Sequence, residues 1–329
     1  MFFPQLVAGP IERPQHLLPQ LRMNHRFDYQ TVTDGLKLMA WGFFQKSVIA
    51  DRLALVVNKV YAAPAAHDGA ALIVATVFFA FQIYCDFSGY SDIAVGTGEV
   101  MGFRLVRNFD RPYFARSIAE FWQRWHISLS TWFRDYVYIP LGGNKTSVGR
   151  WHFNILLTFG LSALWHGGDW TYLIWGMLHG FYYLCSFWTK PIRERIVSFL
   201  RIDSAPGLRR LLQTATTFTL VSFAWIFFRA WNNVDAVYIA THLFQFGTRP
   251  WVWGKEVDSA IGVSQSEFIL TLALIGLVLC VWARQSTGRL RPFIARQPAW
   301  LRWGLYAAAV LAIMNLGVAL NGPFIYFQF

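Results

Sequence analysis

Two histidines, each preceded by a tryptophan, are the residues of this sequence best suited to acid–base chemistry. They are His126 in "RWHIS" and His166 in "LWHGG". An imidazole takes up and returns a proton near neutral pH, so it can remove the proton of a reacting hydroxyl group. Either pair alone is weak evidence, because a single histidine in an apolar segment is more often structural. Together they favour a reaction that takes its substrate from one side of a membrane and releases its product on the other.

Charged and aromatic side chains surround the first of these histidines. Arg124 and Trp125 directly precede His126, and Arg134 and Asp135 follow it. At 100° per residue, a continuous helix would place Arg124 and Asp135 on one face and the histidine on the other. We therefore expect His126 to point into protein or membrane, on a face shared with Trp122, Trp125, Leu129, Phe133 and Tyr136.

The helices that position these residues are predicted to lie in a membrane. The 329-residue chain is 55% hydrophobic and 18% aromatic, and only 14% of its residues are charged, against roughly 25% in a soluble domain. A net charge of +11 could indicate nucleic-acid binding. Basic residues also gather in cytoplasmic loops of membrane proteins, so we expect no nucleic-acid partner. The three cysteines lie apart in apolar stretches, which favours neither a disulfide framework nor a metal site.

Apolar runs near the roughly 20 residues that cross a bilayer as a helix predict several spans. No internal repeat or second domain is evident, so the fold class is an all-α polytopic membrane protein with one domain over 1–329. The predicted spans are 70–85, 151–168, 171–188, 211–229, 268–283 and 303–320, with a weaker one at 36–60.

Loop charge orients these spans. The loops at 190–210 and 284–302 are rich in arginine and are predicted to face the cytoplasm, while the more acidic 230–267 loop faces the other side. The alternation places the region 104–150 along the cytoplasmic leaflet. His166 then lies in a short turn on the outer side.

Three carboxylates and one further histidine occur in segments that are predicted to lie at or near the depth of the membrane. Asp86, Asp92 and Glu99 could line a polar cavity, since such groups are costly in a bilayer unless they are paired or wetted. The density of Gly and Ser around them favours a structural explanation, with close helix packing or a helix break. For His179 a hydrogen-bonded packing role is at least as well supported as a catalytic one.

Five long motifs resemble the membrane-bound O-acyltransferase family, and within it the alginate O-acetyltransferase branch. They cover much of the chain and stand in the family's order. They are "FFPQLVAGPIERPQHLLPQL" (2–21), "YCDFSGYSDIAVGTGEVMGF" (84–103), "NFDRPYFARSIAEFWQRWHISLSTWFRDYVYIPLGGNK" (108–145), "LWHGGDWTYLIWGMLHG" (164–180) and "NGPFIYFQF" (321–329).

The resemblance implies a multi-helix bundle with re-entrant or interfacial helices around a central tunnel. It maps the family's catalytic histidine onto His166 and its second histidine onto His126. It implies acetyl-CoA as the cytoplasmic donor, no bound cofactor, and a polysaccharide acceptor presented outside a bacterial inner membrane with periplasmic acetyltransferase partners. Relatives carry transmembrane helices before the "FFPQL" motif, so we expect this chain to lack them.

Residues near the histidines are candidates for binding the donor or the acceptor. Arg124 and Arg134 could attract the phosphates of acetyl-CoA, and Trp125, Asp135 and Trp165 are further candidates. An equally supported interpretation is that the arginines follow membrane topology and pair with neighbouring carboxylates.

Three other functions remain open at this point. A chain of the same family could transfer D-alanyl groups to teichoic acid with an acyl-carrier partner. A transporter would show inverted repeats or paired broken helices, which the sequence does not suggest. The third alternative is a catalytically inactive scaffold in a secretion complex.

Overall fold

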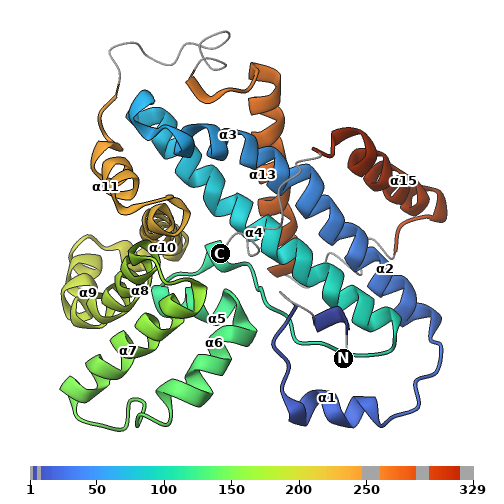
Figure 1. The fold of residues 1–329 in the computed structure, drawn as a ribbon, viewed down its shortest axis with the longest axis horizontal. Helices are drawn as coiled ribbons and strands as arrows, with labels where there is room; N and C mark the ends of the chain where they lie inside the picture. The colour runs from blue at the N-terminus through green and yellow to red at the C-terminus, as the bar shows by residue number, and fades with distance from the viewer. Residues whose placement is uncertain (1–2, 6–8, 247–259, 287–295, 319–329) are drawn as a thin grey trace. The chain divides into compact units, whose positions relative to one another are not determined.

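The computed structural model describes residues 3–5, 9–246, 260–286 and 296–318 (Figure 1). Throughout these residues the secondary structure is helical and contains no strand, which confirms the all-α prediction. Contacts divide the chain into a first unit, Met1–Val106 with the described residues from His242 onward, and a second unit, Arg107–Thr241. The single domain over 1–329 stays a prediction. The motif at 321–329 and parts of the predicted loops 230–267 and 284–302 lie outside the described residues.

In the first unit, helix α4 (Gly69–Val100) packs along α2 (Tyr29–Phe43) (Figure 1). Glycines permit this close approach, because a Cβ atom on Gly89 would lie 2.7 Å from the carbonyl oxygen of Gly42. The helix is continuous through 86–100, so the predicted helix break is wrong. The predicted close packing is confirmed.

The chain continues from α2 through a π-helical segment, Phe44–Ala50, into α3 (Asp51–Ala62). This segment carries Lys46, whose ammonium lies 2.6 Å from Asp86 and 2.8 Å from Asp51. The neighbouring Gln45 donates a hydrogen bond to Asp92 at 2.8 Å. Asp86 and Asp92 therefore have structural partners, as the packing interpretation predicts. The first unit also contains α1 (Pro14–Leu21), α13 (Gln265–Ser286) and α15 (Ala299–Leu316).

The second unit is built around α7 (Val148–His166), α8 (Trp170–Trp188) and α10 (Pro206–Arg229). Helix α8 packs against the other two. A Cβ atom on Gly176 would lie 2.6 Å from the Ala163 Cβ atom, so this glycine lets α8 approach the end of α7 that carries His166. The remaining helices are α5 (Ile118–Arg124), α6 (Ile127–Phe133), α9 (Lys190–Phe199) and α11 (Asn233–His242).

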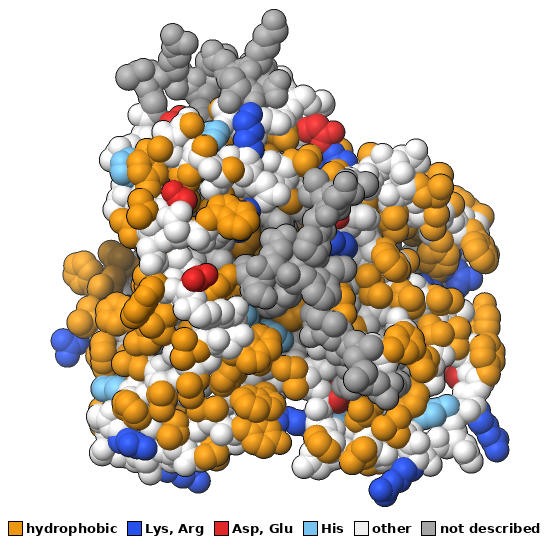
Figure 2. Space-filling model, in the orientation of Figure 1, with side chains coloured by type: hydrophobic (Ala, Val, Ile, Leu, Met, Phe, Trp, Pro, Cys, Tyr) orange, Lys and Arg blue, Asp and Glu red, His pale blue; other side chains and the backbone are white. Residues whose placement is uncertain are grey.

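Four described helices are long and apolar enough to cross a membrane: Gly69–Val100, Pro206–Arg229, Gln265–Gln285 and Ala299–Leu316. They confirm a multi-pass membrane protein. Helices α7 and α8 match the predicted spans 151–168 and 171–188 in position, but they are not among the four. Their Trp, Tyr and His residues lower the mean hydropathy of both helices. Hydrophobic side chains also cover much of the surface in view (Figure 2).

Candidate active site

His126 lies in a turn between two short helices, and the predicted continuous helix is wrong. Helix α5 ends at Arg124, Trp125 is extended, and His126 adopts a left-handed conformation with φ 43° and ψ 55°. Asn108 holds this turn from outside the helices. Its backbone oxygen accepts a hydrogen bond from the Ile127 N–H at 2.9 Å, and its side-chain oxygen accepts one from the Ser128 hydroxyl at 2.6 Å.

The turn changes the predicted aromatic face. Tyr136 is 52% exposed, because the helical register assumed for it is broken at Trp125 and His126. Trp122 is half-buried and donates a hydrogen bond from its indole to His179. The members of the predicted face that are buried are Trp125, His126, Leu129 and Phe133.

His166 is the last residue of α7 and is also buried. Its ring meets Trp175 edge-to-face at 5.1 Å and Phe228 at 5.4 Å between ring centroids. A Cβ atom on the next residue, Gly167, would lie 2.5 Å from the Tyr172 ring, so the chain turns away in contact with α8. The imidazole is thus fixed in an apolar, water-poor setting by α8 and α10.

The structure brings the two histidines into one cluster. The Trp165 ring lies 6.2 Å from that of His126 and 4.9 Å from that of His166. Burial lowers the pKa of His126 well below its usual value, and the nearby His166 lowers it further. His126 is therefore neutral at pH 7. Loop charge alone had placed the histidines on opposite sides of the membrane.

The predicted donor-binding arginines are engaged with carboxylates. Arg124 lies 2.6 Å from Glu120, and Arg134 lies 2.8 Å from Asp135 in an exposed pair. This is the pairing that the alternative interpretation predicts. Trp125 is enclosed between Phe121 and Trp225. Of the other candidates only Trp165 contacts both histidines.

Sequence reasoning missed Trp175, which joins His166 to a third buried histidine. Its ring centroid lies 5.4 Å from that of His179, one helical turn along α8. Nδ1 of His179 accepts the Trp122 indole N–H at 3.3 Å, so a hydrogen-bonded packing role for this histidine is confirmed. The four-residue spacing in "WGMLH" was the available signal. Within the described part of the chain, no three His, Cys, Asp or Glu side chains come together to hold a metal ion.

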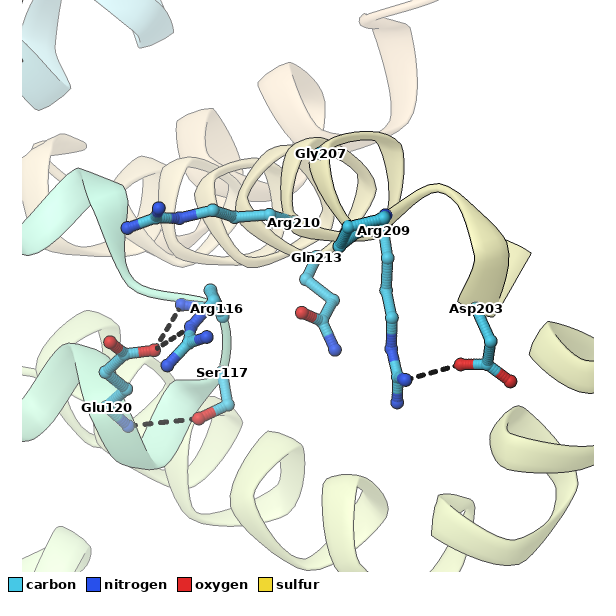
Figure 3. A pocket seen from close by; sticks show the side chains of 9 residues that line it. Arg116, Ser117, Glu120, Asp203, Gly207, Arg209, Arg210 and Gln213 are labelled. Carbon is cyan, nitrogen blue, oxygen red and sulfur yellow. Dashed lines mark hydrogen bonds and ion pairs between the residues drawn. The ribbon is translucent and has the colours of Figure 1, made fainter.

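A polar cavity of about 710 Å³ lies elsewhere in the second unit (Figure 3). Arg116, Ser117 and Glu120 form one wall, and residues at the start of α10 form the other. Sequence reasoning missed it, because the arginines of the 190–210 region were explained by membrane topology alone. No sequence signal joins segments about 90 residues apart.

Known proteins resemble this chain over most of its length. A sequence model described as the membrane-bound O-acyltransferase family matches residues 1–197. A probable alginate O-acetylase of Pseudomonas putida is 36% identical over 99% of this chain and 67% of its own length. A probable alginate O-acetylase of Azotobacter vinelandii is 43% identical, with 74% of this chain and 46% of the relative covered.

A third relative is named for a different acceptor, peptidoglycan. A peptidoglycan O-acetyltransferase of Helicobacter pylori is 36% identical over 72% of this chain and 44% of its own length. The chain thus spans about two thirds of the first relative and less than half of the other two. The matched region contains both histidines of the cluster. The chain belongs to the membrane-bound O-acyltransferase family.

Proposed function

We propose that this chain is part of a membrane O-acetyltransferase that passes acetyl groups from cytoplasmic acetyl-CoA towards an extracytoplasmic polysaccharide. The observation that carries the proposal is the cluster in which Trp165 contacts two buried histidines, His126 and His166. The activities for which the three relatives are named support acetyl as the transferred group and a polysaccharide as the acceptor.

His166 is the general base of the proposed reaction. Its imidazole takes the proton of the acceptor hydroxyl, whose oxygen attacks the thioester carbonyl carbon. The tetrahedral intermediate collapses with cleavage of the carbon–sulfur bond, and the departing thiolate takes the proton back from the imidazolium. A positioned base contributes about 10² to 10⁴ in rate.

His126 assists from the donor side. In its neutral form it donates one hydrogen bond, which can orient the thioester carbonyl or stabilise the developing oxyanion. Removal of one such donor typically costs about 10² to 10³ in rate. Both imidazoles are buried, so their electrostatic interactions are stronger than in solution.

The membrane setting supplies the direction of transfer. We place the protein in the bacterial inner membrane, with its donor on the cytoplasmic side and its acceptor, together with periplasmic acetyltransferase partners, on the other. Acetyl transfer is favoured over D-alanyl transfer because the relatives described above are an O-acetyltransferase and two probable O-acetylases.

The test uses membranes that contain the full-length protein. Radiolabelled acetyl-CoA and a D-alanyl-loaded carrier protein are supplied in separate reactions, and label on polysaccharide is measured. We expect label from acetyl-CoA alone, reduced at least about 100-fold by His166→Gln. If label reaches the polysaccharide only in the reaction with the D-alanyl-loaded carrier protein, the protein transfers D-alanyl groups and the proposal is wrong. Label from neither would support the scaffold alternative.

A further inference from the structure

The polar cavity of the second unit is lined by three arginines from two distant segments. Arg116 precedes α5, while Arg209 and Arg210 lie in the first turn and a half of α10 (Figure 3). The volume of about 710 Å³ is within the range of small-molecule sites. Both walls belong to segments whose loop charge predicts a cytoplasmic location.

The cavity keeps a surplus of positive charge. Arg116 lies 3.4 Å from Glu120, and Arg209 lies 2.5 Å from Asp203. Glu120 is also bound by Arg124 at 2.6 Å, so one carboxylate serves two guanidinium groups. Arg210 forms no ion pair with any residue that the structure describes, and Figure 3 shows its side chain extended along the cavity.

Glu120 is ionised at neutral pH, so its carboxylate offsets one of the positive charges of the cavity. Partial burial raises its pKa, but the Arg116 backbone N–H and the charges of Arg124 and Arg116 outweigh burial and hold the pKa below its usual value. The cavity remains positive with this negative charge counted, because its arginines outnumber its two carboxylates, Glu120 and Asp203.

The start of α10 adds to the attraction for anions. Pro206 and Gly207 line the cavity, and no side chain caps the helix. The first-turn N–H groups and the helix dipole favour a negative group there. A Cβ atom on Gly207 would meet no atom within 4 Å, so there is open space beside this backbone.

We propose that this cavity binds a phosphate group, which in the proposed function is a phosphate of the acyl-CoA donor. Guanidinium groups bind phosphate oxygens through paired, charge-assisted hydrogen bonds, and the exposed Arg210 is available for this role. The proposal rests on the proposed function for the donor's identity. The donor's long flexible arm would carry its thioester away from this anchor.

The cavity wall is linked to the histidine cluster by α5. Glu120 and Arg124 are paired across one turn of this helix, about 6 Å of rise, and Arg124 stands two residues before His126. A phosphate held at Arg116 and Arg210 therefore anchors the donor beside the helix that leads into the His126 turn.

The test compares Arg210→Gln with Arg195→Gln in the full-length protein. Arg195 is an exposed arginine of α9 that does not line the cavity, so its substitution matches the change in net charge. We expect Arg210→Gln to raise KM for acetyl-CoA about 10-fold with kcat unchanged, the loss of one charge-assisted contact. With acetyl-pantetheine, which lacks phosphates, both variants should match the wild type. Equal KM values for acetyl-CoA in the two variants would overturn the proposal.

Two further experiments complete the test. One tests the cavity independently of the proposed function, and the other distinguishes a phosphate of the donor from that of a lipid headgroup. Binding of 3′,5′-ADP to the purified protein requires no turnover, and Arg210→Gln should weaken it. If that binding depends on Arg210 while no acetyl is transferred, the cavity stands and the proposed function fails. Assays in vesicles with and without phosphatidylglycerol identify the source. An Arg210 effect seen only with this lipid would assign the cavity to lipid headgroups and overturn the donor assignment.

Discussion

Replacement of Asn108 by alanine should damage both stability and acetyl transfer, because this residue holds the His126 turn. The Asn108 side chain is 1% exposed, and it accepts a hydrogen bond from the Ser128 hydroxyl at 2.6 Å. Asn108→Ala leaves that hydroxyl buried beside a void, at a cost of about 1–3 kcal/mol. The left-handed His126 stores about 1–3 kcal/mol of backbone strain that the surroundings must balance.

A double-mutant cycle isolates the bond. Ser128→Ala removes the same hydrogen bond from the other side, so the double variant Asn108→Ala/Ser128→Ala should be less destabilised than the sum of the two single variants by about 1 kcal/mol. The assay is thermal unfolding of the detergent-solubilised full-length protein, together with acetyl transfer by each variant. Additive effects, or full activity with Asn108→Ala, would refute the claim that Asn108 positions His126.

Three further predictions concern packing, protonation and buried charge. Gly89→Ala should lower the melting temperature, because the new Cβ would lie 2.7 Å from a backbone oxygen of α2, at a cost of about 1–3 kcal/mol. The control is Gly276→Ala, whose Cβ meets no atom within 4 Å and which should leave the melting temperature unchanged. The folded-state pKa of His126 is lowered, so below its usual value of about 6.5 the unfolded chain binds a proton that the folded chain does not, and stability should fall as pH decreases. Unfolding measured across pH should therefore show a weaker acid dependence for His126→Gln, and an unchanged profile would argue against a buried neutral imidazole. Lys46→Met should destabilise by about 3–5 kcal/mol because it leaves buried Asp86 without its lysine, and adding Asp86→Asn should restore part of the loss in the same unfolding assay.

The sequence was sufficient for the fold class and for the choice of histidines. Apolar run length depends only on local composition, so helices appear at the predicted spans, including 211–229 and 268–283. The motifs around His126 and His166 were likewise visible without a structure. The proximity of the two histidines was not visible, since Trp165 links segments 40 residues apart in the chain.

Contacts between residues far apart in the sequence explain why predictions from local sequence patterns were wrong. Helical periodicity predicted one continuous face around His126, but Asn108, 18 residues earlier in the sequence, stabilises a turn that breaks it. The density of glycine in 86–100 suggested a helix break, whereas Gly89 and Gly96 serve close contact with α2. Arg116 and Arg210 lie far apart in the sequence, and only the fold brings them to the same cavity.

The central claim is that His166 is the base that makes acetyl transfer possible. The most direct test is the acetyl content of secreted polysaccharide in a deletion strain complemented with the full-length wild-type gene or with His166→Ala. At equal amounts of protein in the membrane, we predict that His166→Ala gives the acetyl content of the uncomplemented deletion strain. An acetyl content equal to that of the wild type would contradict the account.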